Sequence, residues 1–486
     1  MTTELVGKQL RQSLALHNTL TGTQDQFTPA DHETVRMYVC GPTVYSAPHI
    51  GNMRTYLFSD VLRRTLRFAG YGVRAAMNIT DVGHLTSDAD TGDDKMAMAA
   101  AAERATAWEI AEKYTAKFFA DAQQLNILPM DYVLRATDHI PHQIALIERL
   151  EEKGFVYRTA DGLYFDTSLV PDYGKLTPND TRENIRAGER VAMGEKRHTT
   201  DFALWKFSRP GAPKRDMEWP SPWGVGFPGW HIECSAMAME YLGETLDMHL
   251  GGIDHIAIHH SNEIAQSESA TGKPFSRWWM HGAFLTAEGA RRMGKSEGNQ
   301  ITVTTLREWG YHPLDFRYLV LLSHYRSPLT FSRGVLDSAA VALGRLRHRV
   351  AALVAAAEAE DLPTPEPQAQ DSPYLQQFVA ALAEDLNMPR AVSVLWNLVR
   401  DPDVADALKL TLLRSFDEVL GLDLDAAPET AAPQVPHEVA QLAQRRWELR
   451  SQRKWAESDE LRDAIHAAGY EVQDGPDGYQ LVPRKE

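Results

Sequence analysis

The chain has 486 residues, of which 43% are hydrophobic and 24% are charged, and its formal net charge is −16. This length and apolar content predict several packed domains. No apolar run reaches the ~18 residues that a membrane span needs, and the opening residues lack the apolar core of a secretory signal. The acidic balance argues against a general nucleic-acid coat protein but is compatible with an enzyme that has local basic patches.

The first part of the chain predicts an α/β unit. "VRMYVCG" (35–41) is a β-rich segment that ends at Gly-Pro. In 49–70, apolar residues recur with helical period from Met53 and stop at Gly70. "YGVRAAMNITD" (71–81) is the next expected strand. A strand, loop, helix and strand in this order predict a parallel sheet.

The middle of the chain predicts an insertion in this unit. Long helices are expected over 96–124 and 138–153, followed by a hairpin over 154–168 centred on Asp161-Gly162. Residues 172–222 are rich in charge, Gly and Pro and are expected to form a partly irregular inserted domain. The segment 246–272 then returns to strand, glycine turn and helix.

From about residue 327 the pattern becomes helical. Helices are expected over 333–360, 374–396 and 403–420, the first two separated by a Pro-rich loop. After a second linker (423–436), residues 437–486 read as two charged helices and a hairpin. We therefore expect an N-terminal α/β body, a helical middle and a small C-terminal module.

Three local patterns could carry chemistry, and none is decisive alone. In "AIHHSNE" (257–263), His259 and Glu263 share one helical face. They could belong to a surface cluster, an acid–base pair or a metal site. The chain's two cysteines, Cys40 and Cys234, could join them, although a free cysteine is more often a buried structural residue. Scarce cysteine without a secretory signal also predicts the reducing cytoplasm.

The other two patterns suit phosphate. In "PHIGNMRT", His49, Gly51 and Asn52 lie where a helix begins, and a helix N-terminus attracts anions. The alternative is that His49 is a cap or a packed residue. In "RRMGKSEGNQITV" (291–303), Lys295 lies in a glycine-flanked loop that could close over polyphosphate. The alternative is a solvated basic turn.

Longer segments around these patterns form one recognisable series. "MYVCGPTVYSAPHIGNMRTY", "NITD", "GWHIECSAM", "GGIDH", "HHSNEIAQSE" and "MGKSEGN" follow one another along the chain. In this order they resemble cysteinyl-tRNA synthetases, and the two phosphate patterns resemble the HIGH and KMSKS signatures of class I aminoacyl-tRNA synthetases. The likeness runs from "LHNTLTGTQDQF" to "WAESDELRDAIHAAGYEVQDGPDG", nearly the whole chain.

The resemblance implies an α/β fold: a Rossmann-type parallel-sheet catalytic domain with an insertion, a helical bundle and a small α+β anticodon-binding module. The expected parts are the first half of the catalytic domain (1–135), the inserted domain (136–215), the second half with the zinc site (216–285), the signature-loop region (286–326), the bundle (327–430) and the module (437–486).

The implied activity is that of a cysteine–tRNA ligase. The enzyme would activate L-cysteine with ATP and Mg²⁺ to cysteinyl-adenylate and pyrophosphate, then transfer cysteine to the terminal ribose of tRNA(Cys), without editing. Two alternatives remain: a ligase that joins cysteine to a small amine, whose known relatives lack the terminal module, and a non-catalytic zinc protein that binds RNA. A monomer without membrane contact is expected.

The resemblance also assigns residues. One Zn²⁺ would be held by Cys40, Cys234, His259 and Glu263, although spacing alone would also permit His260 in place of His259. ATP would contact His49, Gly51, Asn52, Arg292 and Lys295. Cysteine would contact Gly41, Thr43, Thr80, Trp230 and Asp254. The basic stretch "QRRWELRSQRKW" of the module suits phosphate contact and base stacking, so tRNA is expected at Arg445, Arg446, Trp447, Arg450, Arg453 and Lys454.

Three positions in the two signatures depart from the family's pattern. Asn52 stands at the last HIGH position, and Asn donates hydrogen bonds but cannot become cationic. The signature loop reads Arg-Met-Gly-Lys-Ser, with Arg292 for the first Lys and Gly294 for the first Ser. Lys295 is retained, so an active enzyme is still expected.

Overall fold

The computed structural model describes residues 2–83, 94–177, 195–208, 215–287, 291–292, 300–360, 369–426, 437–452, 454–475 and 478–483. Its centre is a five-stranded sheet in the order β11-β10-β3-β4-β5, and all of its pairings are parallel. The strands are β3 (Thr34–Val39), β4 (Gly72–Ile79), β5 (Tyr132–Arg135), β10 (Leu246–Gly252) and β11 (Ser276–Gly282). The strand order reverses between β3 and β10, which is where doubly wound sheets open a ligand crevice at their carboxyl ends. The expected parallel α/β fold is confirmed.

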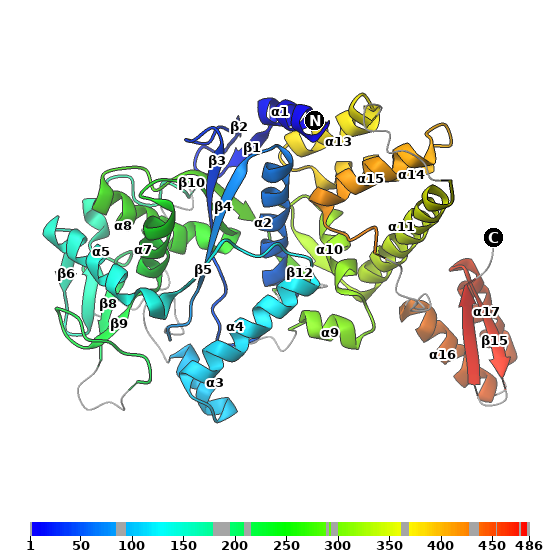
Figure 1. Cartoon of the computed structure of the whole chain (residues 1–486). Helices are drawn as coiled ribbons and strands as arrows, with labels where there is room; N and C mark the ends of the chain where they lie inside the picture. Colours follow the sequence, from blue (N-terminus) through cyan, green and yellow to red (C-terminus); the bar gives the residue numbers. More distant parts are fainter. Residues whose placement is uncertain are drawn as a thin grey trace.

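Alternate residues of β3 serve the two faces of the sheet. Met37 and Val39 belong to the core cluster that includes α2 (Ile50–Phe68), whereas Tyr38 and Cys40 belong to a second cluster that includes α7 (Trp230–Leu242). This follows from the two-residue period of a strand. Figure 1 shows α2 on one side of the strands, and α7 with α8 (Ser261–Thr271) on the other.

The helix expected over 96–124 is two helices, so that expectation was wrong. The structure has α3 (Lys95–Glu103) and α4 (Ala107–Gln124). Arg104 has a left-handed φ of 55°, and Thr106 then begins α4 in a capping box with Glu109. The Thr-x-x-Glu spacing is the sequence signature of a helix start, and it overrides the continuous apolar pattern.

The insertion contributes three strands to a four-stranded antiparallel sheet in the order β6-β7-β8-β9, and β9 joins it from beyond the expected boundary at residue 215. The elements of this region are α5 (Ile140–Glu152), β6 (Val156–Arg158), β7 (Gly162–Phe165), β8 (Phe202–Phe207) and β9 (Gly226–Pro228). The hairpin at Asp161-Gly162 is confirmed, with the Thr159 amide donating to the Gly162 carbonyl at 2.9 Å. Residues 178–194 and 209–214 lie outside the described part of the chain.

The helical middle packs beside the sheet. Its elements are β12 (Leu285–Ala287), β13 (Arg291–Arg292), α9 (Val303–Glu308), α10 (Pro313–Leu321), β14 (Leu329–Phe331), α11 (Arg333–Glu360), α13 (Pro373–Ala383), α14 (Met388–Arg400) and α15 (Asp406–Leu420). The single helix expected over 374–396 is split into α13 and α14. At the break Asp385 and Leu386 have φ values of 50° and 56°. The Asp385 carboxylate accepts bonds from Tyr325 and Arg326, at 2.7 Å each, so tertiary contacts set the break.

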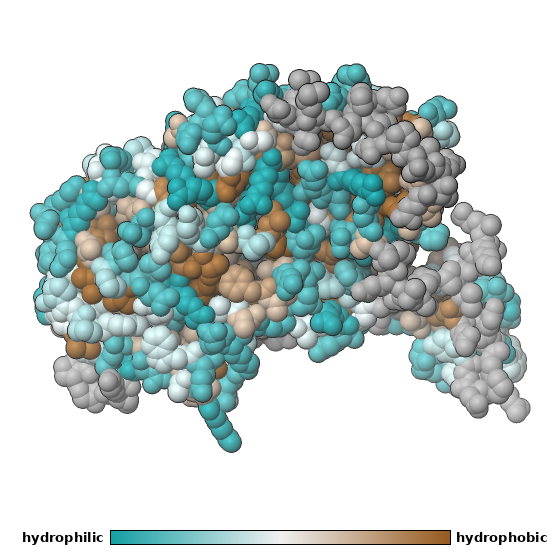
Figure 2. Space-filling view, viewed as in Figure 1, coloured by the Kyte–Doolittle hydropathy of each residue, from teal (hydrophilic) through white to brown (hydrophobic). Residues whose placement is uncertain are grey.

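The C-terminal module consists of α16 (His437–Ser451), α17 (Trp455–Ala467), β15 (Tyr470–Gly475) and β16 (Gly478–Pro483), with its own small core cluster. The chain's beginning adds α1 (Thr2–Ser13), β1 (Ala15–Asn18) and β2 (Thr23–Gln26). The module projects from the body in Figure 1 and Figure 2, and most of the face in this view is hydrophilic. Among the described residues, no helix is both long and apolar enough to span a membrane.

Candidate active site and metal centre

Cys40 follows β3 directly, at the carboxyl edge where the strand order reverses. Its amide donates to the Leu250 carbonyl of β10 at 3.0 Å. The next residue, Gly41, donates to Asn78 Oδ1 at 2.7 Å, and a Cβ at Gly41 would lie 1.7 Å from the Asn78 carbonyl oxygen. Only glycine allows the backbone after β3 to approach the end of β4 this closely. The tight turn aims the Cys40 thiol at the crevice.

Four residues predicted as metal ligands come together at this point. Cys234 lies in α7, Glu263 in the first turn of α8, and His259 in a π-helical turn, η4 (Ile256–His260). One candidate ligand atom from each, together with Cys40, lies within 4.8 Å of the others, and all four residues are buried. Such turns within helices are often found at functional sites.

A second set of donors shares two of these residues. Cys40, His249, His260 and Glu263 also offer ligand atoms within 4.8 Å of one another, and they too are buried. His259 Nε2 lies 2.6 Å from Glu263 Oε1, whereas His249 Nε2 lies 2.5 Å from Glu263 Oε2. Cys40 Sγ lies 3.3 Å from His260 Nε2. His259 and His249 therefore contact opposite oxygens of the Glu263 carboxylate.

The protonation of the first set suits displacement by a cation. The hydrogen bond between Cys234 and the Cys40 thiol lowers the pKa of Cys234 to about 6. Burial raises the pKa of Cys40 well above its ordinary value. Burial would lower the pKa of His259, but Glu263 and Cys234 outweigh it and raise that pKa to about 10. Burial would raise the pKa of Glu263, yet His249 and His259 hold it below its ordinary value. Protons thus hold the cluster together, and metal binding releases such protons.

Sequence reasoning missed the histidines around this cluster. His231 Nδ1 lies 3.0 Å from His259 Nδ1, and His281 Nε2 lies 2.8 Å from His260 Nδ1. His249 stacks on Trp279, with the ring centroids 4.5 Å apart. The sequence carries one signal for His249, because His249 lies in the expected strand just before the glycine pair Gly251-Gly252. His281 belongs to β11, whose adjacency to β10 only the topology reveals.

The residues predicted to contact cysteine lie around the same crevice. Thr43 and Thr80 form an isolated parallel bridge between the segments after β3 and β4. Trp230, the first residue of α7, places its ring 4.4 Å from the ring of His259. Asp254 is exposed and lies in η3 (Ile253–His255), directly after β10. Three strand ends and one helix start therefore contribute.

At the start of α2, His49 and Asn52 form a capping box. His49 Nδ1 accepts a hydrogen bond from the Asn52 amide at 3.1 Å, and Asn52 Oδ1 accepts one from the His49 amide at 3.2 Å. A Cβ at Gly51 would lie 2.9 Å from the His49 ring. The cap uses Nδ1 of the His49 ring and Oδ1 of the Asn52 amide. The cap alternative is thus present, and it does not exclude contact with phosphate.

Some predicted residues lie outside the described part. Lys295 lies among residues 293–299, which are outside the described part of the chain. Arg453 is also outside it. Arg292 is described only as part of β13.

In the module, Arg445 and Lys454 are exposed, and Trp447 and Arg450 are half-buried. Arg446 is only 2% exposed, so its expected direct contact with tRNA does not fit the structure. The helix carrying it turns that side chain inward, next to Ala443 and Leu449 of the same apolar stripe. Trp455 is 55% exposed, with the Arg450 guanidinium 5.4 Å from its ring.

Known proteins give the arrangement a family. A model described as tRNA synthetases class I (C) catalytic domain matches residues 26–341. Relatives include Cysteine--tRNA ligase 1 of Burkholderia lata, 50% identical over 468 residues that cover 96% of each chain. The Cysteine--tRNA ligase of Treponema denticola is 40% identical over 484 residues, which cover 95% of this chain and 98% of that one.

Solved structures agree on the fold. Mycobacterium tuberculosis methionyl-tRNA synthetase in complex with methionyl-adenylate has a TM-score of 0.54 at 18% identity, over 80% of this chain and 90% of that one. With the sheet order, the buried donor set and these relatives, the chain belongs to the cysteine–tRNA ligase family of class I tRNA synthetases.

Proposed function

We propose that the chain joins L-cysteine to the 3′-terminal ribose of tRNA(Cys) in two steps, with cysteinyl-adenylate as the intermediate. The observation that carries the proposal is the buried group of Cys40, Cys234, His259 and Glu263 at the carboxyl edge of the sheet. The names of relatives that match nearly the whole chain support the same activity.

In the first step, the cysteine carboxylate attacks the α-phosphate of ATP, and pyrophosphate leaves. The start of α2 supplies a positive dipole end for the phosphates. We assign His49, Gly51 and Asn52 to this end of the triphosphate, and Arg292 and Lys295 to the pyrophosphate, with Mg²⁺ accompanying ATP. In the second step, the ribose hydroxyl attacks the mixed anhydride and AMP leaves. Positioning and charge stabilisation do the catalysis, without a side-chain nucleophile.

The donor set fits zinc. Two thiols, an imidazole and a carboxylate are accepted zinc donors, and the close packing of four such groups in a buried place needs a cation or shared protons. We prefer this set to the one with His249 and His260, because it contains both thiols. Zinc bound there would favour a thiolate over a neutral hydroxyl, whereas an apolar pocket rejects an isosteric hydroxyl by only ~10². No editing site is then needed.

The remaining pocket assignments follow from position. Gly41, Thr43 and Thr80 would line the amino-acid pocket, and Trp230 would close over the substrate. Asp254 would pair with the α-ammonium group, a charge-assisted contact. For the module, we assign tRNA contacts to Arg445, Trp447, Arg450, Arg453 and Lys454, leaving out the buried Arg446. Basic side chains near aromatic rings suit phosphate contact and base stacking in single-stranded RNA.

The proposed domain boundaries remain those expected from sequence: 1–135, 136–215, 216–285, 286–326, 327–430 and 437–486. We propose a monomer and a cytoplasmic location.

Two assays test the proposal against its alternatives. The first is cysteine-dependent exchange of pyrophosphate into ATP, and the second is charging of tRNA(Cys) transcripts. Both reactions are expected. Exchange without charging would favour a ligase that uses a small amine acceptor, and absence of exchange would favour a non-catalytic RNA-binding protein.

A further inference from the structure

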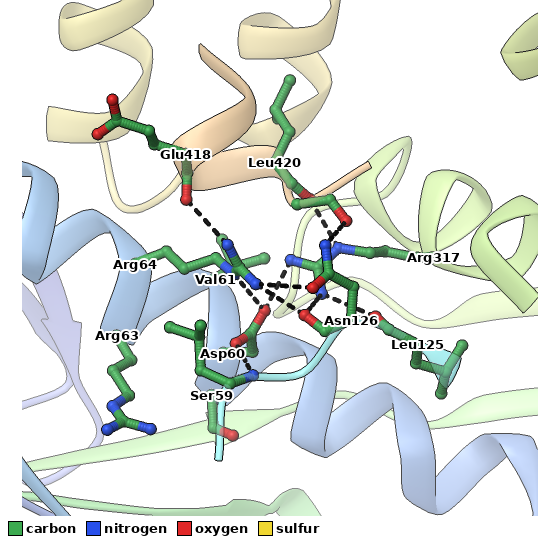
Figure 3. Close-up of polar contacts among 12 residues, drawn as sticks. Ser59, Asp60, Val61, Arg63, Arg64, Leu125, Asn126, Arg317, Glu418 and Leu420 are labelled. Atoms are coloured by element: carbon green, nitrogen blue, oxygen red, sulfur yellow. Dashed lines mark hydrogen bonds and ion pairs between the residues drawn. The ribbon is translucent and has the colours of Figure 1, made fainter. Parts of the chain in front are cut away.

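Arg317 lies where four segments far apart in the sequence meet. Its side chain, on α10, is fully buried. Nη2 donates to Asp60 Oδ2 at 2.7 Å, Nε to the Leu420 carbonyl at 2.6 Å, and Nη1 to the carbonyls of Leu125 and Asn126 at 3.0 Å. Figure 3 shows the guanidinium between the side chain of Asp60 and the carbonyl of Leu420. One side chain therefore ties the end of α15 to α2 and to the end of α4.

Arg64, one turn after Asp60 on α2, completes this joint. Its Nε donates to Asp60 Oδ2 at 2.8 Å, Nη1 to the Glu418 carbonyl at 3.1 Å and Nη2 to the Asn126 carbonyl at 2.7 Å. Two guanidinium groups thus share one buried carboxylate. Their other N–H groups meet carbonyls at the ends of α4 and α15. The last carbonyls of a helix lack intrahelical partners and form its negative end, so cations are favoured there.

The end of α15 fits the joint closely. Gly421 has a left-handed φ of 61°, and a Cβ there would lie 2.5 Å from Arg317 Nη2. Asn126 Nδ2 donates to the Gly421 carbonyl at 2.9 Å, and Arg347 of α11 donates to the Leu422 carbonyl at 3.0 Å. These bonds fix the direction in which the chain leaves α15.

The joint stands between the two regions that one tRNA would have to reach. On one side, α2 begins at the His49–Asn52 cap that we assign to ATP. On the other side, α15 is the last described helix before α16, which opens the C-terminal module. A buried ion pair usually adds little net stability compared with apolar packing, and in some proteins such a pair restricts geometry.

We propose that Arg317, held by Asp60, is a positioning residue for tRNA charging. It sets the direction in which the bundle carries the C-terminal module relative to the ATP and cysteine site. The inference rests on the proposed function, because it requires one RNA to contact both regions. Activation of cysteine, which involves no RNA, should not need the joint.

The test compares Arg317→Met with a matched control, Arg63→Met. Arg63, like Arg317, is a buried arginine, and it lies on α2. Its hydrogen bonds go to the Pro129 carbonyl at 2.5 Å and to Asp131 Oδ2 at 2.9 Å. In Figure 3 it points away from the joint. Each full-length protein is assayed for pyrophosphate exchange, for charging of tRNA(Cys), and for charging of a minihelix that copies only its acceptor stem.

For Arg317→Met, we expect exchange and minihelix charging within about twofold of wild type, and a KM for full tRNA raised about tenfold. Arg317→Lys should restore part of this loss, since lysine can still reach Asp60. Arg63→Met should leave the ratio of the three activities unchanged. Gly421→Ala, which displaces the end of α15 but keeps every charge, should repeat the pattern of Arg317→Met and serves if that variant does not fold.

An equal loss in all three assays, or an unchanged KM for full tRNA, in Arg317→Met or Gly421→Ala would overturn the inference and leave a purely structural joint. A wild-type protein without exchange would instead contradict the proposed function. The two failures are therefore distinguishable.

Discussion

At the scale of single residues, the proposed zinc site would decide how the substrate's sulfur is recognised. Cys234→Ser replaces one thiol of the proposed zinc site by a hydroxyl, which is a much poorer zinc ligand. We expect metal content to fall well below that of wild type, and the KM for cysteine in the exchange assay to rise at least ~10-fold. Elemental analysis of the purified protein measures the metal content, and the kinetics of pyrophosphate exchange measure the KM for cysteine. Unchanged metal and unchanged KM would show that Cys234 is not a ligand.

The adjacent histidines can be separated by a matched pair of variants. His259 belongs to the donor set with both thiols, and His260 to the set with His249. We expect His259→Asn to lose the metal and His260→Asn to retain it, because the first set has the two thiols that zinc prefers. The zinc released from each variant and from wild type during titration with a chelator measures the difference. The reverse result would favour the set with His260.

At this scale, the sequence could predict part of the site. Cys40 and Cys234 are the only cysteines, so motif resemblance alone was enough to join them with His259 and Glu263. The carboxylate's second contact, with His249, depends on a 2.5 Å approach between two elements and has no sequence signature. The choice between His259 and His260 also remained open, since both face the cluster.

Among the elements, α2 carries two tasks at its start. The Asn52 side chain caps the helix through Oδ1, and we propose that its amide group faces ATP. Asn52→Asp keeps the hydrogen-bond acceptor but replaces the NH2 donor with a negative charge. Asn52→Ala removes both the acceptor and the donor. We expect Asn52→Ala to lower the free energy of unfolding by about 1 kcal/mol. Asn52→Asp should keep the midpoint temperature of thermal unfolding but lower the rate of pyrophosphate exchange about tenfold. Repulsion of ~1.4 kcal/mol between the new carboxylate and the phosphates of ATP is enough for a tenfold loss of rate. Wild-type exchange in Asn52→Asp would place Asn52 away from phosphate.

Element prediction succeeded where local signals agreed and failed where they competed. The helix expected from Met53 is α2, whose observed start lies three residues earlier because its cap involves His49. The break between α13 and α14 could not be predicted, since the left-handed Asp385 is held by Tyr325 and Arg326, about 60 residues away. A periodic pattern reports local preference, and tertiary hydrogen bonds overrode it there.

For the whole molecule, the C-terminal module should separate the two steps of the reaction. We expect removal of residues 437–486 to leave pyrophosphate exchange within about twofold, because the proposed cysteine and ATP sites lie in the sheet domain. Charging of tRNA(Cys) should lose about 100-fold in kcat/KM, since the module supplies exposed cations and an aromatic ring for stacking, worth ~1–3 kcal/mol per base. Parallel assays of the truncated and full chains measure both. Undiminished charging would place anticodon contacts elsewhere.

The order of parts could be predicted from sequence, but the way they join could not. Alternating strands and helices indicated the parallel sheet, and composition marked the helical middle and the final module. The joint between Asp60 and Arg317 links positions 257 residues apart. Each looks like an ordinary charged residue of an amphipathic helix, and only the packed structure shows that both are buried.

The most direct test of the account is competitive charging of tRNA(Cys) with cysteine and serine at equal concentrations, followed by analysis of the attached amino acid. A thiolate-selective site predicts cysteine over serine by clearly more than the ~10² available to an apolar pocket. Serine attached at a comparable level, or no cysteine attached at all, would contradict the central claim.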